Sequence, residues 1–140
     1  MRESQLAYQL RVLFEKKITS YYLDSFKGKF GKVQVEVLIY LYDNVRVRVQ
    51  DLAEELNIPK QHASKIITRL EELGYVAGSM CEGDKRAKLY FLTELGMELM
   101  NQHIEASNCN FEKLLEGLTL GEKTQFVVSM ENMIRILEKM

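Results

Sequence analysis

The side chains with the clearest chemistry in this sequence gather in a stretch that contains no acids. No Asp or Glu stands between Glu55 and Glu71, although the chain has 20 acidic residues against 19 basic ones. Gln can pair with adenine, Lys and Arg with guanine, and Ser and Thr with bases or phosphates. The stretch offers such groups, or a hydrogen-bonding imidazole, at Lys60, Gln61, His62, Ser64, Lys65, Thr68 and Arg69. It could therefore approach DNA, whose phosphates would repel an acid there.

This stretch is expected to form a helix with two unlike faces. Pro59 suits the first turn of a helix, because its missing N–H costs nothing there, and Gly74 stands where a C-terminal cap is expected. Apolar residues recur between them at helical spacing: Ala63, Ile66, Ile67, Leu70 and Leu73. A shorter helix is predicted from about Val49, so the two helices and their tight turn predict a helix-turn-helix.

A β-hairpin is predicted directly after the second helix. Two apolar stretches, residues 75–81 and 87–93, flank the polar turn "EGDKR". The cationic residues of this tip are Lys85, Arg86 and Lys88, and Asp84 could hold Arg86 extended by pairing with it. A solvated turn explains the tip taken alone. Helix and tip together could touch one duplex, with the helix in the major groove and the tip at the backbone or minor groove.

Long amphipathic helices are expected at both ends of the chain. Apolar residues recur at helical spacing from about Ser4 to Asp24, and two further helices are predicted after Thr93 and after Thr119. Thr93 is a good N-cap, and Thr119 has capping-box spacing with Glu122. The expected stripe of the first C-terminal helix includes Leu95, Leu99, Met100, His103, Ala106 and Leu114.

Two segments between these helices are harder to assign. Residues 33–42 alternate β-branched residues as a strand does, yet their spacing also fits a helix, so local pattern leaves both open. The segment "VRVRV" at 45–49 alternates and could form a short strand. Neither a membrane-length apolar run nor a signal peptide is present, so no membrane association is expected and a cytoplasmic location is predicted.

Two quoted segments, "VQDLAEELNIPKQHASKIITRLEELGYV" and "GDKRAKLYFLTELG", resemble the MarR family of winged helix-turn-helix transcription regulators. The matching motifs are the "LAEEL" helix, the "SKIITRLEELGYV" recognition helix and the "D-x-R-A-K" wing that leads into "LT-x-x-G". The likeness is strong over roughly half of the chain. The flanking helices match in order and length but carry little motif content.

The resemblance implies a mainly α fold with a small β-hairpin wing. A winged helix-turn-helix DNA-binding region, residues 31–93, is flanked by an N-terminal dimerisation helix (1–30) and C-terminal dimerisation helices (94–140), and residues 33–42 become a helix. The implied function is sequence-specific binding of double-stranded DNA by a homodimer, acting as a ligand-responsive repressor on a pseudo-palindromic operator. Family members commonly bind phenolic ligands, metals or oxidants between the dimer helices and the winged domain; the effector and its binding residues remain unknown from this sequence.

Other classes of site fit the sequence less well. Redox-sensing relatives place a cysteine in the first helix, whereas the cysteines here are Cys81 and Cys109, and zinc sensors need more histidines than His62 and His103. No metal and no cofactor is therefore expected. No nucleophile–base arrangement or phosphate loop is visible, so an enzyme is not predicted. The alternative function is a winged-helix protein–protein interaction module that does not bind DNA.

Overall fold

The computed structural model describes residues 2–20, 26, 28–81 and 84–140, with only the backbone described at 81 and 84–87. A short π-helical turn, η1, follows the first helix, and a single hairpin is the only sheet in this part of the chain. In chain order the elements are α1 (Arg2–Phe14), η1 (Glu15–Thr19), α3 (Lys32–Asp43), α4 (Val49–Leu56), α5 (Lys60–Glu72), β1 (Val76–Cys81), β2 (Asp84–Leu92), α6 (Glu94–Leu115) and α7 (Leu120–Leu137).

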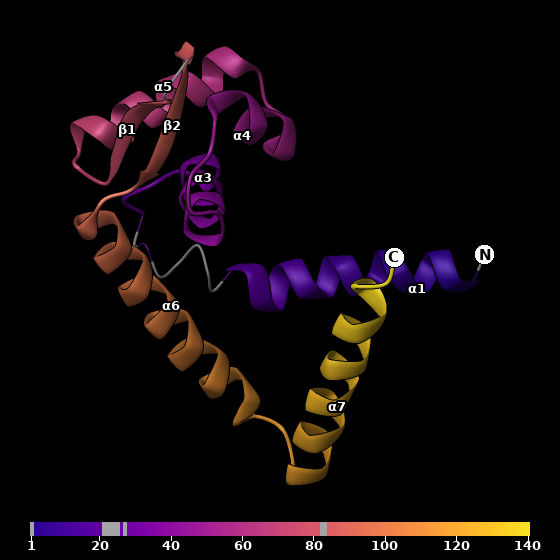
Figure 1. Ribbon diagram of the computed structural model, residues 1–140. Helices are drawn as coiled ribbons and strands as arrows, with labels where there is room; N and C mark the ends of the chain where they lie inside the picture. Colours follow the sequence, from indigo (N-terminus) through magenta and orange to yellow (C-terminus); the bar gives the residue numbers. More distant parts are fainter. Residues whose placement is uncertain (1, 21–25, 27, 82–83) are drawn as a thin grey trace.

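The elements divide between two ends of the molecule. Helices α3, α4 and α5 gather with the hairpin at one end, while α6 leads away to the other end, where α7 turns back toward α1 (Figure 1). This arrangement is the expected mainly α fold with a hairpin wing between terminal helices. None of the helices in the described part of the chain is long and apolar enough to cross a membrane.

One hydrophobic core holds the compact end together. Leu38 of α3, Leu52 of α4 and Leu70 of α5 are fully buried in it, and Met100 of α6 joins them. Each helix therefore faces the core with its apolar side, which is the main source of its stability. Helical spacing put Leu73 and Leu95 on apolar stripes, but neither side chain is buried. Leu73 is 39% exposed and Leu95 is 49% exposed.

The two ambiguous segments are settled by packing. Residues 33–42 lie within helix α3, as the family resemblance implied, because Val35, Val37, Leu38 and Leu41 are all buried on it. The 45–49 segment contributes one bridge, between Val47 and Tyr90, rather than a strand of its own. The second hairpin strand begins at Asp84, so the "DKR" residues that were predicted to lie in the turn belong to β2. The strand register shifts between Met80 and Cys81.

Thr93 joins the segment after α5 to the start of α6. Its hydroxyl donates to the Gly74 carbonyl at 2.6 Å and accepts from the Gly96 N–H at 3.1 Å, which confirms Thr93 as the N-cap. Gly74 has a φ of +86°, which favours glycine, and a Cβ added at Gly96 would collide with the Tyr75 carbonyl oxygen. The "LT-x-x-G" motif thus packs the start of α6 directly against the end of α5.

The C-terminal helix begins with the predicted capping box. The Thr119 N–H donates to Glu122 at 3.1 Å, and the Glu122 N–H donates to the Thr119 hydroxyl at 3.2 Å. Hydrogen bonds from the Thr119 backbone and side chain hold the pKa of Glu122 below its usual range. The cap fixes where α7 starts, although no residue of α7 is buried.

His103 is a buried histidine on α6. Its imidazole stacks on the Phe26 ring with centroids 3.9 Å apart, and burial lowers its pKa. A histidine that binds its proton more weakly in the folded chain than in the unfolded chain destabilises the fold in acid. The neutral imidazole is therefore part of the packing between α6 and the segment before α3.

We expect the free energy of unfolding to fall as the pH is lowered from about 7.5 to about 5.5, because the unfolded chain takes up a proton that folded His103 resists. Denaturant unfolding at both pH values measures this. His103→Gln should remove part of the fall, while His62→Gln, which changes the exposed histidine, should leave it intact. An equal pH dependence in both variants would contradict the assignment.

Candidate DNA-binding surface

The turn between α4 and α5 sets the angle between the two helices. Asn57 adopts a left-handed conformation (φ 53°, ψ 47°), and the N–H of Ile58 donates to the Ala53 carbonyl at 3.0 Å. Pro59 was expected within the first turn of α5, but it is the N-cap, one residue before the helix begins. The Pro59 carbonyl accepts a hydrogen bond from the Ala63 N–H at 3.1 Å. So short a connection forces α5 to cross α4 steeply, as in a helix-turn-helix.

Helix α5 buries one face and exposes the other. Ala63, Ile66, Ile67 and Leu70 are buried against the core. The remaining predicted contact residues of the helix are exposed apart from half-buried Ser64: Lys60, Gln61, His62, Lys65, Thr68 and Arg69. Gln61, Lys65 and Thr68 stand at i, i+4 and i+7, so they form one row along the exposed face. The structure therefore brings the sequence-predicted groups of α5 together.

Two residues of this exposed face already have partners. The Thr68 hydroxyl donates its hydrogen to the Ser64 carbonyl at 2.9 Å. The Thr68 hydroxyl can therefore still accept a hydrogen bond but has no hydrogen left to donate. Arg69 pairs with Glu72 at 3.4 Å, and both side chains are well exposed, so the pair is held weakly. Lys60, Gln61 and Lys65 make no side-chain hydrogen bond or ion pair with another described residue and are the most available groups.

The hairpin positions Lys88 through a glycine. Gly78 of β1 faces Tyr90 of β2, and a Cβ at Gly78 would lie 2.6 Å from the Lys88 Cε and 2.9 Å from the Tyr90 ring. The missing side chain lets the Tyr90 ring lie across β1, and the Lys88 ammonium sits 5.4 Å from the centroid of that ring. No role was predicted for Gly78 or Tyr90 from the sequence. Both lie in the two predicted strands of the hairpin, which was the one signal that could have placed them opposite each other.

The tip of the hairpin is described by its backbone alone. Asp84, Lys85 and Arg86 lie at the start of β2, so they extend from the same strand as Lys88. The predicted pairing of Asp84 with Arg86 concerns side chains outside the described residues. Within the described residues, no group of three or more His, Cys, Asp or Glu side chains could hold a metal ion.

A helix-turn-helix whose second helix exposes a row of polar and cationic residues, followed by a hairpin, is the arrangement of a winged-helix DNA-binding protein. Residues 31–87 match the sequence model of the MarR family, so the helix-turn-helix and most of the hairpin are similar to that family. The curated relatives are named as HTH-type transcriptional regulators, which supports a DNA-binding regulator rather than an enzyme.

Similar proteins cover nearly the whole chain. The HTH-type transcriptional regulator YfiV of Bacillus subtilis is 27% identical over 134 residues, which is 93% of this chain and 84% of YfiV. The transcriptional regulator Tm0710 of Thermotoga maritima has a TM-score of 0.81 at 19% identity, with 97% of this chain and 96% of Tm0710 covered. A mutant of S. aureus MepR bound to an oligodeoxyribonucleotide has a TM-score of 0.69 at 19% identity, with 94% and 97% covered. The terminal helices therefore share the fold of these proteins as well.

We expect Asn57→Ala to lower the free energy of unfolding by about 1 kcal/mol, because alanine tolerates the left-handed conformation poorly. Asn57→Gly is the matched control and should cost much less, since glycine adopts this conformation freely. Urea unfolding of the two variants measures the difference. Equal stability in both would show that the backbone conformation of residue 57 does not constrain the turn.

Proposed function

We propose that the exposed face of α5 reads the major groove of double-stranded DNA. Gln61 and Lys65 would contact base edges, while Lys60, Ser64, Thr68 and Arg69 would contact bases or phosphates, with His62 at the flank. Lys85, Arg86 and Lys88 would meet the backbone or minor groove, with Asp84 holding Arg86. The observation that carries this proposal is the acid-free row on α5, which is exposed while the opposite face is buried.

The protein is proposed to act as a homodimer through its terminal helices. No residue of α1 or α7 is buried, although both helices carry large apolar side chains, among them Leu13 and Ile134 at 56% exposure each. Exposed apolar surface of this extent favours burial against another molecule. A two-fold dimer would present two α5 helices to a pseudo-palindromic site. A MepR mutant of the same fold is bound to an oligodeoxyribonucleotide, which supports DNA binding by this fold.

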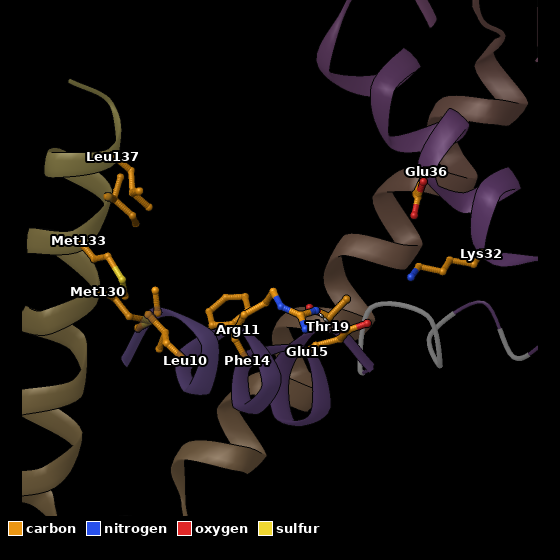
Figure 2. Close-up of a pocket in the computed structure, with 12 residues that line it drawn as sticks. Leu10, Arg11, Phe14, Glu15, Thr19, Lys32, Glu36, Met130, Met133 and Leu137 are labelled. Carbon is orange, nitrogen blue, oxygen red and sulfur yellow. Dashed lines mark hydrogen bonds and ion pairs between the residues drawn. The ribbon is translucent and has the colours of Figure 1, made fainter. Parts of the chain in front are cut away.

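An open hollow beside these helices, lined in part by Ile134 of the proposed dimer surface, is the proposed place of a small-molecule effector. It has a volume of about 700 Å³ and lies between α1, the start of α3 and α7. Figure 2 shows Leu10 and Phe14 of α1 across from Met130 and Met133 of α7, with Arg11 and Glu15 near the Lys32 side of the cavity. A related structure, BpsR of Bordetella bronchiseptica (TM-score 0.60, 21% identity, 91% of each chain covered), is described as regulated in DNA binding by 6-hydroxynicotinic acid.

The proposed role is therefore that of a ligand-responsive repressor in the cytoplasm, with an effector of unknown identity. Residues 31–93 would form the DNA-binding region, while residues 1–30 and 94–140 would form the dimer. The family match at 31–87 supports the first boundary. An effector bound between α1 and α7 would change the spacing of the two DNA-binding regions, because both helices belong to the proposed dimer interface.

Selection of bound duplexes from a random pool tests the DNA-binding proposal. Affinity for the selected duplex should fall by orders of magnitude between about 50 and 200 mM salt, because phosphate contacts release counterions. Lys65→Ala should weaken binding by roughly 1–3 kcal/mol on the selected sequence and less on unrelated duplex. Lys113→Ala, which removes an exposed lysine of α6, is the matched control.

The alternative function gives the opposite result. A winged-helix protein–protein module would bind no duplex even at low salt, and Lys65→Ala would change nothing. Equal weakening by Lys65→Ala on every duplex would make Lys65 a backbone contact and leave sequence recognition to other residues.

We expect Leu13→Glu or Ile134→Glu to weaken dimerisation at least about tenfold, since each buries a charge in the proposed interface. Sedimentation over a concentration series measures the dissociation constant. Val45→Glu places the same charge on an exposed apolar residue between α3 and α4 and should leave the dimer intact. A monomeric wild-type protein at micromolar concentration would contradict the proposal.

A further inference from the structure

Two arginines between α3 and α4 have no place in the surface described so far. They belong to the "VRVRV" segment, in which Val47 is only 4% exposed while Arg46 and Arg48 are exposed. Val47 and Tyr90 exchange two backbone hydrogen bonds, of 2.9 and 2.8 Å, so Val47 occupies the position of a third strand beside β2. Because successive side chains of a strand point to opposite faces, both arginines project from the outer face of the sheet.

The Arg46 side chain lies on an aromatic ring, whereas only the backbone of Arg48 is fixed. The Arg46 guanidinium lies 5.6 Å from the centroid of the Phe91 ring, the residue next to Tyr90 on β2. Arg48 is the N-cap residue of α4, so its backbone is fixed by the helix. Neither guanidinium forms an ion pair with any residue in the described part of the chain. A guanidinium positioned in this way can bind a phosphate through two hydrogen bonds.

The arginines lie at the same end of the molecule as α5 and the hairpin. The link between α3 and α4 runs beside β2, and the start of α4 is at the same end as α5, far from α7 (Figure 1). Strand β2 continues from Phe91 through Lys88 to the hairpin tip. Lys88 shares a sheet face with Tyr90 and Val47, so Arg46 and Arg48 form a separate cationic pair on the opposite face, next to the start of α4.

We propose that Arg46 and Arg48 bind phosphates of the duplex outside the groove that α5 fills. This inference rests on the proposed DNA binding and adds a flanking contact to it, so the bound duplex must extend past the base pairs that α5 and the hairpin tip touch. Phosphate is the favoured anion because two exposed guanidinium groups lie at the same end of the molecule as the α5 row that is proposed to meet DNA (Figure 1). An acidic protein segment on the same face is the competing partner.

The test compares long and short duplexes that share one selected core sequence. Arg46→Ala/Arg48→Ala removes two phosphate contacts per protomer, or four per dimer, which lowers the salt slope on the long duplex by about 3.6. Wild-type protein should then lose about 150-fold more affinity than the variant between about 50 and 200 mM salt. On the short duplex without flanks, the two proteins should show the same slope.

Three controls separate the outcomes. Lys113→Ala/Lys123→Ala removes the same charge from α6 and α7 and should keep the wild-type slope, and Arg46→Lys/Arg48→Lys should keep most of it because the charges remain. Thermal unfolding of each variant checks that the hairpin survives without the Arg46–Phe91 contact. An unchanged slope in a folded Ala variant that still binds the core overturns the flanking contact alone. Absence of wild-type binding to any duplex overturns the proposed function as well.

Discussion

Burial of one face of α5 is the constraint on which the rest of the structure depends. When Ile67 and Leu70 are buried against the core, the residues on the opposite side of the helix remain exposed to solvent, because the helical period fixes which residues share a face. Hydrophobic packing therefore positions Gln61 and Lys65 without contacting them. A fully buried aliphatic side chain contributes about 1.5–3 kcal/mol, far more than the exposed Arg69–Glu72 pair can.

The neighbouring elements fix α5 at both of its ends. Asn57 sets the entry through its left-handed backbone, and Thr93 ties the exit to α6 through the Gly74 carbonyl. Gly96 lets the first turn of α6 approach Tyr75 closely. The start of α6 and the end of α5 are therefore joined by direct contacts. These contacts connect α6 to the surface proposed to meet DNA.

The two ends of the molecule follow opposite rules of burial. The compact end buries a core of apolar residues within one chain, whereas no residue of α1 or α7 is buried. An isolated amphipathic helix gains little from its own hydrogen bonds, so such helices need a partner surface. The proposed dimer supplies that surface and doubles the DNA contacts. The flanking arginines would add to those contacts on each side of the two-fold axis.

The sequence by itself determined the pattern that a local signal can carry. The two-faced α5, the caps at Thr93 and Thr119 and the hairpin after Gly74 follow from periodicity, capping chemistry and turn residues, all of which act within a few positions of the chain. The acid-free stretch also marked the surface before any fold was known. The motif resemblance added the prediction that residues 33–42 form a helix, since their local pattern fits either a strand or a helix.

Only the tertiary structure decided what depends on contacts between distant segments. Residues 33–42 pack as helix α3 because four of their side chains meet the core of other elements, and this overrides their β-branched preference. Leu73 and Leu95 lie at the end of α5 and the start of α6 and remain exposed, which helical spacing did not predict. Val47 pairs with Tyr90, a residue far along the chain, in a contact that no local rule encodes, and that pairing alone turns Arg46 and Arg48 outward.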